Sequence, residues 1–115
     1  MLANDYQRAV IRAINRIEPG EEGVAYGLLT LKEKIQLNAL SLSNEAGEVA
    51  GEVKKQYWYK SRPQAEFHGR VVKELCDSLY HIAALAQVLG LTMDDLFIEG
   101  MEIISQKHGL PDKTE

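Results

Sequence analysis

The sequence contains a single cysteine, Cys76, among its 115 residues. One cysteine forms neither an internal disulfide nor a cysteine-based zinc site, and chains without disulfides are typical of reducing compartments. Apolar runs are only a few residues long, whereas a membrane-spanning helix needs about twenty consecutive apolar residues. The opening segment MLANDYQRAVIRAINRIE carries charges throughout and lacks the apolar core of a secretory signal. We therefore expect a cytoplasmic protein without a membrane partner.

Basic residues are also fewer than acidic ones: the chain has 13 lysines and arginines and 17 aspartates and glutamates, for a net charge of −4. This balance offers no electrostatic surface for a nucleic-acid backbone, so nucleic acid is not an expected partner. The chain also lacks the G-x-x-x-x-G-K-[ST] and G-x-G-x-x-G turns, which hold phosphates through backbone N–H groups. A triphosphate would therefore have to be held through metal.

Strand-like alternation of apolar and polar residues is absent as well. Length favours one domain over residues 1–115, since a chain of this size buries roughly two thirds of its unfolded surface. A hydrophobic fraction of 45% and a charged fraction of 26% are ordinary for a globular protein. The sequence thus predicts a single all-α domain.

Apolar residues recur at helical spacing in four segments. The first covers residues 6–17, and Pro19 and Gly20 should end it. A glycine-rich acidic loop follows. Thr30, with Glu33 three residues later, predicts a capping box at the start of a long second helix.

A loop around Pro63 separates this second helix from a third. In the third segment apolar residues recur over residues 71–89, and Gly90 is a typical helix terminator. Thr92 with Asp95 predicts the start of a fourth helix. We expect these four helices to form a bundle-like fold.

Two rows of residues follow the second helix. An apolar stripe, which should pack against a partner helix, consists of Ile35, Ala39, Leu42, Ala46, Val49, Val53 and Tyr57. A polar row on its flank consists of Asn38, Ser41, Glu45, Glu48, Glu52 and Lys55.

Two acidic pairs carry most of the functional information. Glu45 and Glu48 lie on the second helix, and Glu74 and Asp77 lie on the third. Residues three apart share one side of a helix, so antiparallel packing can bring all four carboxylates together. Four like charges at short distance require a divalent cation, and a set of carboxylate oxygens favours magnesium or manganese over zinc or iron. A single E-x-x-E pair would instead be read as solvated surface charge.

Basic and aromatic residues near the acidic pairs are candidates for substrate contacts. Lys54, Lys55 and Arg70 could stabilise a polyphosphate. Asn38 and Trp58 are further candidates. Trp58 and its two tyrosine neighbours could stack on a base, although aromatic residues of this kind more often belong to a core or a subunit interface.

The segments LSLSNEAGEVAGEVKK and KELCDSLYHIAALAQVLG together resemble the all-α nucleoside triphosphate pyrophosphohydrolases, the MazG-like group, whose hallmark is E-x-x-E followed by E-x-x-D. The similarity runs from about Leu40 to His108. It implies hydrolysis of a nucleoside triphosphate between the α and β phosphates, giving a monophosphate and pyrophosphate. It also implies a homodimer or dimer of dimers that shares the site, with Mg²⁺, or Mn²⁺ in its place, bound by Glu45, Glu48, Glu74 and Asp77.

The chain departs from this group in its last helix. Gly100 and Ile103 occupy positions where many members carry Asn and Lys, and Lys107 is a candidate substitute. His81 stands where an aromatic residue is frequent, one turn after Asp77, and is a candidate to position that carboxylate.

Two other functions fit the same residues. One is a related pyrophosphohydrolase acting on phosphoribosyl-ATP, whose carboxylate arrangement is similar. The other is a non-catalytic helical interaction module, in which Gly47, Gly51 and Trp58 meet a partner and the acids are merely solvated.

Overall fold

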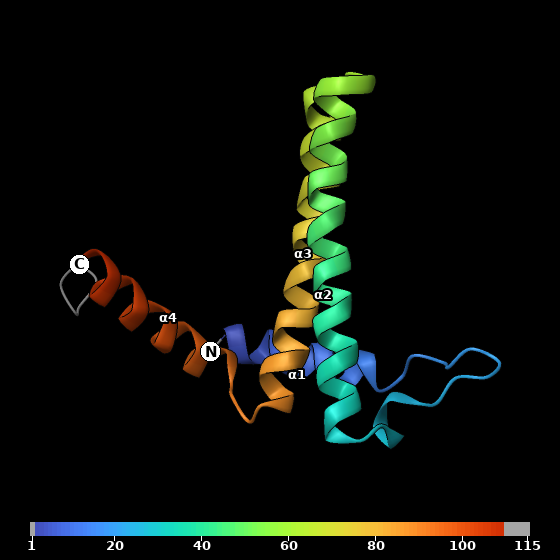
Figure 1. Ribbon diagram of the computed structural model, residues 1–115, viewed down its shortest axis with the longest axis vertical. Helices are drawn as coiled ribbons and strands as arrows, with labels where there is room; N and C mark the ends of the chain where they lie inside the picture. The colour runs from blue at the N-terminus through green and yellow to red at the C-terminus, as the bar shows by residue number, and fades with distance from the viewer. Residues whose placement is uncertain (1, 110–115) are drawn as a thin grey trace.

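The computed structural model describes residues 2–109, and within them every regular element is helical (Figure 1). This confirms the all-α prediction and the number of helices. The elements follow in the order α1 (Leu2–Ile14), η1 (Tyr26–Leu28), α2 (Leu31–Lys54), η2 (Lys55–Tyr59), α3 (Gln64–Val88) and α4 (Met93–His108), where η1 is a 3₁₀ turn and η2 a π-helical turn.

The two long helices α2 and α3 form an antiparallel hairpin that stands upright in Figure 1. Helix α1 crosses the lower end of this hairpin, and α4 leaves the same end sideways. Among the described helices, α2 and α3 run side by side over most of their length, and neither α1 nor α4 lies against the upper half of the hairpin.

The predicted helix boundaries are confirmed at three ends. The Thr30 hydroxyl accepts from the Glu33 N–H at 3.2 Å, while a Glu33 carboxylate oxygen accepts from the Thr30 N–H at 2.8 Å. Thr92 and Asp95 make the same reciprocal pair at 3.0 Å in both directions. Gly90, with φ +79°, follows α3 in the left-handed region that glycine tolerates.

The prediction that the first helix reaches residue 17 is wrong, since α1 ends at Ile14. The Asn15 side chain donates to the Ile11 carbonyl at 2.9 Å, and short side chains of this kind compete with helical backbone bonds. The next two N–H groups then bond to carbonyls three residues back, in a tighter turn. Ile17 is left 58% exposed.

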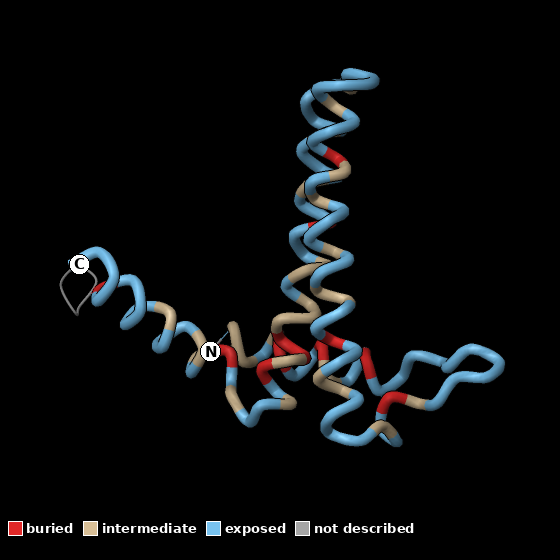
Figure 2. The backbone as a smooth tube through the Cα atoms, in the orientation of Figure 1, coloured by how far each residue is buried: buried red, intermediate tan, exposed pale blue. Residues whose placement is uncertain are grey.

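The apolar core lies at the lower end of the hairpin (Figure 2). Its buried members are Val10, Ile14, Tyr26, Ala83, Ala84, Ala86 and Met93. Buried Gln7 holds this region together, because its amide donates to the carbonyls of Ala83 and Leu91 at 3.3 and 2.9 Å and accepts from the Met93 N–H at 3.0 Å. Helix α1 is thereby bonded to the end of α3 and the start of α4.

The predicted apolar stripe on α2 is covered only in part. Val53 and Tyr57 are exposed, whereas the buried residues of α2 are the polar Asn38 and Glu52. Asn38 contacts His81 of α3, and Glu52 pairs with an arginine of the following loop. Polar residues thus take the buried positions of α2, and part of the apolar stripe is exposed.

One chain leaves more surface exposed than a compact protein of its size. Its accessible surface is 8555 Å², against about 6,300 Å² expected for a monomer of this mass. The radius of gyration is 17.1 Å, against about 13 Å for a compact domain. The excess, about 2,200 Å², includes many exposed apolar side chains.

Within residues 2–109, no single helix is both long and apolar enough to cross a membrane. Only α3 and α4 taken together meet this condition, as a pair bent by 100° at the break between them.

Candidate metal centre

Three of the four predicted acidic residues meet between α2 and α3. Glu45 and Glu48 of α2 and Glu74 of α3 each offer one carboxylate oxygen, and these oxygens all lie within 4.8 Å of one another. The spacing of three residues places both α2 carboxylates on one side of the helix, and the antiparallel packing of α3 brings the third to them. We call these three residues the acidic cluster.

Two oxygens of the acidic cluster are buried and lack a hydrogen-bond partner within the described chain. They are Glu45 Oε2 and Glu74 Oε2. Burying a carboxylate oxygen without a partner is costly, and a cation bound between the helices would satisfy both atoms. The donors are all carboxylate oxygens, the ligands that Mg²⁺ and Mn²⁺ prefer, so these residues fit the predicted metal.

Burial and the neighbouring carboxylates also act on the pKa of Glu74, one of the three residues of the acidic cluster. The pKa of Glu74 is raised, first because a hydrogen bond with the Glu48 carboxylate favours its protonated form, and then because of burial and the charge of Glu48. Lys73 opposes this shift. The neighbouring carboxylates therefore disfavour the ionised form of Glu74, as expected where like charges share one site.

Asp77, the fourth predicted ligand, does not belong to the acidic cluster. Its carboxylate accepts from the Lys73 ammonium at 3.0 Å, and the same ammonium lies 3.7 Å from Glu74 Oε1. The hydrogen bond to Asp77 raises the pKa of Lys73. Lys73 was not among the predicted site residues, although its position four residues before Asp77 is a typical helical ion-pair spacing.

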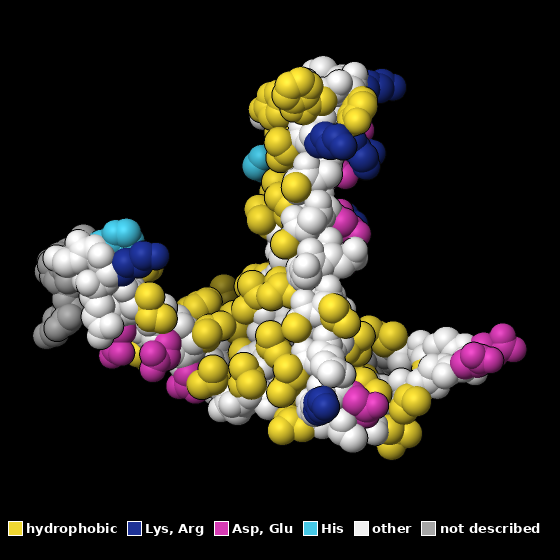
Figure 3. Space-filling view, viewed as in Figure 1, with side chains coloured by type: hydrophobic (Ala, Val, Ile, Leu, Met, Phe, Trp, Pro, Cys, Tyr) yellow, Lys and Arg dark blue, Asp and Glu magenta, His cyan; other side chains and the backbone are white. Residues whose placement is uncertain are grey.

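A cavity of about 580 Å³ opens beside the acidic cluster. Figure 3 shows acidic side chains along one side of the hairpin, with lysine and arginine side chains above them. The cavity is lined by Ser43, Asn44, Gly47, Glu48, Gly51, Glu52, Lys55 and Glu74. A Cβ added at Gly47 or Gly51 would meet no atom within 4 Å, so the two glycines leave this wall bare without being needed for packing inside the chain.

Glu52 lies in the same row but is bonded elsewhere. Its carboxylate accepts from Arg62 Nη1 at 2.8 Å, and Arg62 Nη2 donates to the Glu52 carbonyl at 3.2 Å. Gln56 exchanges two hydrogen bonds with the Arg62 backbone, at 2.9 and 3.0 Å. The Arg62 hydrogen bond lowers the pKa of Glu52. The pair of Glu52 and Arg62 fixes the loop to the upper end of α2, and neither residue was a predicted site residue.

Of the three predicted basic contacts, only Lys55 lines the cavity, where its ammonium lies 3.7 Å from Glu52. The Lys54 ammonium lies over the Tyr59 ring, 5.6 Å from its centroid. Arg70 pairs with Glu66 on α3 at 3.3 Å. Lys54 and Arg70 are therefore engaged by neighbours on the hairpin and do not line the cavity.

The other two predicted substrate contacts lie at opposite ends of the hairpin. Trp58 is in η2 at the upper tip, and 81% of its surface is exposed. Asn38 is completely buried near the lower end and bonds to three neighbouring groups. Neither residue contributes to the acidic cluster.

The last helix does not approach the acidic cluster of its own chain. Gly100, Ile103 and Lys107 lie on α4, which projects away from the hairpin (Figure 1). Any contact between these residues and the acidic cluster would have to come from a second copy.

Comparison of the chain with protein-family models, with curated proteins and with solved structures finds no match.

Proposed function

We propose that the protein hydrolyses nucleoside or deoxynucleoside triphosphates between the α and β phosphates, giving a nucleoside monophosphate and pyrophosphate. One observation carries the proposal: three carboxylates from two helices converge within 4.8 Å, and two of their oxygens are buried without a partner. A cavity with Lys55 on its wall adjoins them. The resemblance of the paired acidic motif to the MazG-like group supports the same reaction.

Glu45, Glu48 and Glu74 would hold Mg²⁺, or Mn²⁺ in its place, and Asp77 would join them if Lys73 released it. The bound cation would neutralise phosphate charge and lower the pKa of a water molecule. In the reaction, the water oxygen bonds to the α-phosphorus and the bond from that phosphorus to the bridging oxygen breaks. Pyrophosphate leaves with the electron pair. A carboxylate of the acidic cluster takes up the proton, and Lys55 stabilises the phosphates through its charge.

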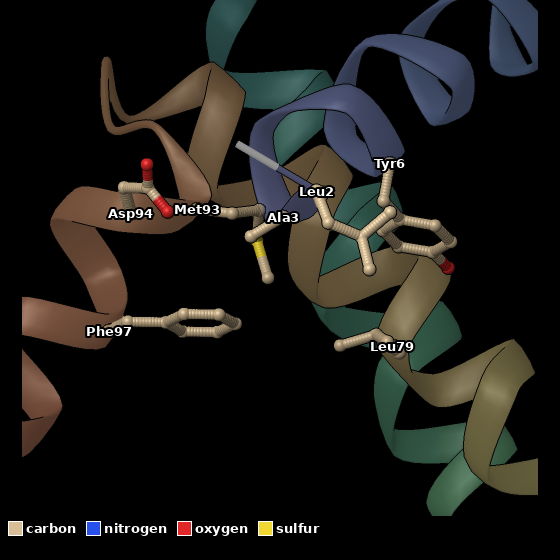
Figure 4. A pocket seen from close by; sticks show the side chains of 7 residues that line it. All are labelled: Leu2, Ala3, Tyr6, Leu79, Met93, Asp94 and Phe97. Carbon is tan, nitrogen blue, oxygen red and sulfur yellow. The ribbon is translucent and has the colours of Figure 1, made fainter.

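We also propose that two copies of the chain assemble as a homodimer, which a dimer of dimers could extend. Apolar residues on the uncovered face of α3, Val72, Leu75 and Leu79, are 41%, 53% and 38% exposed. Figure 4 shows where this face continues into a cavity of about 510 Å³ between α1, α3 and α4, lined by Leu2, Ala3, Tyr6, Leu79, Met93, Asp94 and Phe97.

A second copy of the chain is the partner we propose for this apolar face, because the excess accessible surface is as large as a homodimer interface. The excess surface of about 2,200 Å² per chain falls in the range that obligate homodimers bury. Helix α4 also offers its own apolar residues, with Phe97 and Ile104 at 54% and 46% exposure. Their spacing of seven residues equals that of Val72 and Leu79, so the two stripes have the same length of about 10 Å.

The test is to incubate the protein with Mg²⁺ and a panel of ribo- and deoxyribonucleoside triphosphates that includes phosphoribosyl-ATP. Pyrophosphate should appear together with the monophosphate, and chelation of the metal should stop the reaction. Release of orthophosphate alone would reject the assigned bond. Turnover of phosphoribosyl-ATP alone would favour the related pyrophosphohydrolase.

A non-catalytic interaction module is the second candidate, and the exposed aromatic tip favours it, because Tyr57, Trp58 and Tyr59 are 72%, 81% and 73% exposed. Titration with Mg²⁺ separates the two. An acidic site that binds the cation raises the melting temperature of the folded state, whereas solvated acids leave it nearly unchanged. We place the proposed activity in the cytoplasm, in line with the single free cysteine.

A further inference from the structure

A third cavity, of about 250 Å³, lies lower on the hairpin, where the two ends of the loop after α1 meet α2 and α3. Most of its wall is apolar, and a few polar side chains converge on it. Those that matter here are Ile17, Val24 and Leu37 among the apolar residues and Ser41 and His81 among the polar ones. An apolar pocket with few polar groups, just below the size of a pocket for a drug-sized molecule, suits a small planar ligand.

This pocket lies on the same hairpin as the acidic cluster, about two helical turns away. Asn38 precedes Glu45 by seven residues on α2, and His81 follows Glu74 by seven on α3. Because the helices are antiparallel, both steps lead toward the lower end, by about 10 Å. That separation is comparable with the distance from a phosphate-bound cation to the far edge of the base in an extended nucleotide.

The protonation of His81 follows from its buried neighbour Asn38. The Asn38 amide nitrogen lies 2.9 Å from the Lys34 carbonyl and 2.9 Å from the Tyr26 hydroxyl. A backbone carbonyl only accepts, so this end of the side chain must be the NH₂ group. The amide oxygen therefore faces His81 Nδ1, at 3.3 Å, and Nδ1 must carry the hydrogen.

His81 consequently presents an acceptor at its other nitrogen. Burial lowers the pKa of His81, against a smaller opposing effect of the Asp77 charge, so the ring is neutral at pH 7. In a neutral ring whose Nδ1 is protonated, Nε2 has a free lone pair. Within residues 2–109, no hydrogen bond to Nε2 is formed.

We propose that this pocket takes the base of the nucleotide, with His81 Nε2 accepting a hydrogen bond from an N–H group on the edge of the base. The inference rests on the proposed function and identifies where the nucleoside part of its substrate lies. Apolar side chains such as Ile17 and Leu37 contact the faces of the base, and His81 reads its edge. Ser41, on the wall of the pocket, lies one turn before Glu45 on α2, and Ser78 lies between Glu74 and His81 on α3, so the sugar would pass these two serines.

An acceptor at His81 Nε2 predicts that the protein distinguishes bases that can donate a hydrogen bond at this edge from bases that cannot. A base cannot donate at this edge when its ring N–H is replaced by N-methyl or its exocyclic NH₂ group by N,N-dimethyl, and such a base leaves Nε2 buried against a methyl group. Loss of one such hydrogen bond should lower kcat/KM about tenfold. The effect should fall mainly on KM, because the base is remote from the α-phosphorus.

The experiment compares the best triphosphate of the panel with the analogue in which methyl groups replace every N–H hydrogen on that edge of the base, on the wild type and on His81→Phe. We expect the wild type to prefer the unmethylated substrate about tenfold, and His81→Phe to lose that preference. His68→Phe is the matched control, since His68 is exposed on the same helix and outside the pocket. It should discriminate as the wild type does. Equal discrimination by His81→Phe and the wild type would overturn the proposal.

A measurement on the wild type alone covers the case in which His81→Phe does not fold. Long-range ¹H–¹⁵N spectra of the histidine rings should show the Nδ1–H form of His81 and a shift of its Nε2 signal when the metal-free protein is titrated with the nucleoside monophosphate. An Nε2–H form, or no shift at saturation, would overturn the proposal. A shift without any triphosphate turnover would keep the base pocket and reject the proposed hydrolysis, whereas turnover without a shift would do the reverse.

Discussion

The lower end of the molecule and the upper part of its hairpin are built in opposite ways. At the lower end, alanines of α3 allow α1 to approach, Met93 is 2% exposed, and Gln7 satisfies three backbone groups. In the upper part, the buried side chains between α2 and α3 include Glu52 and Glu74, and apolar side chains such as Leu75 face outward.

This difference indicates that the lower end stabilises the fold, while the upper part carries the candidate site. The lower end buries apolar surface and hydrogen-bonds its polar groups, so it stabilises the fold without help. The upper part concentrates negative charge and leaves carboxylate oxygens without partners, an arrangement that costs stability. Local rules of stable folding are most often broken at functional sites, and the acidic cluster is where this chain breaks them.

The largest effect is expected from removing one charge of the acidic cluster. Glu48→Gln should lower pyrophosphate release by at least about 100-fold, because it removes a metal ligand of the proposed site. The fold should be retained, since Glu48 is exposed. Glu102→Gln, an exposed glutamate on α4, is the matched control and should keep full activity. Undiminished activity of Glu48→Gln would remove this residue from the site.

A core substitution should affect stability and leave cation binding intact. Met93→Ala removes a side chain that is 2% exposed, and it should lower the free energy of unfolding by about 2–5 kcal/mol in urea titrations. Leu40→Ala, at a position 72% exposed, should cost less than about 0.5 kcal/mol. A loss of Mg²⁺ affinity in folded Met93→Ala would contradict the separation between the two regions.

The outward-facing apolar residues should decide assembly. Leu75→Asp places a charge in the proposed interface, and light scattering coupled to size exclusion should detect monomers where the wild type gives dimers. The same substitution at Leu40, on the side of α2 away from α3, should leave the dimer intact. A monomeric wild type at high concentration would reject the proposed interface.

The smallest expected effect is a change in how stability varies with pH. Because the pKa of Glu74 is raised above 4.5 in the folded state, its contribution to stability is full below pH 4.5 and is lost as pH rises through the folded pKa. Metal-free Glu74→Gln should lack this loss and melt a few degrees above the wild type at pH 7. Mg²⁺ should stabilise the wild type more than the variant.

Thermal melts from pH 4 to 8, with and without Mg²⁺, check this prediction. Glu52 contributes in the opposite sense, because its lowered pKa gives stability that is lost as pH falls. Since both proteins keep Glu52, the difference between their curves isolates Glu74. Identical curves for the wild type and Glu74→Gln would show that the carboxylates do not repel one another.

Much of the local structure could be read from the sequence. The capping boxes at Thr30 and Thr92 and the glycine after α3 set helix ends through contacts between residues close in the chain. The end of α1 could not be read in this way, because the apolar spacing continues to Ile17 while the Asn15 side chain already bonds to the backbone.

The residues of the candidate site were easier to predict from the sequence than the ion pairs that these residues form. Spacing alone placed Glu45 and Glu48 on one side of a helix, and the acidic motif pointed to Glu74. The pairing of Glu52 with Arg62 was not apparent, because Lys54 and Lys55 lie nearer to Glu52 in the sequence. The spacing of Lys73 and Asp77 is that of an ordinary helical ion pair, but this spacing alone does not exclude Asp77 from a metal site.

The sequence by itself determined four helices, their caps and the acidic pairs, since these depend on periodicity and on neighbours within a few residues. Only the tertiary structure decided that Asn38, Glu45 and Glu48 of α2 meet residues of α3, that Asn38 fixes the hydrogen of His81, and that an apolar face of α3 stays uncovered. These outcomes depend on how α2 and α3 are rotated about their axes, and that rotation is set by contacts between residues far apart in the chain.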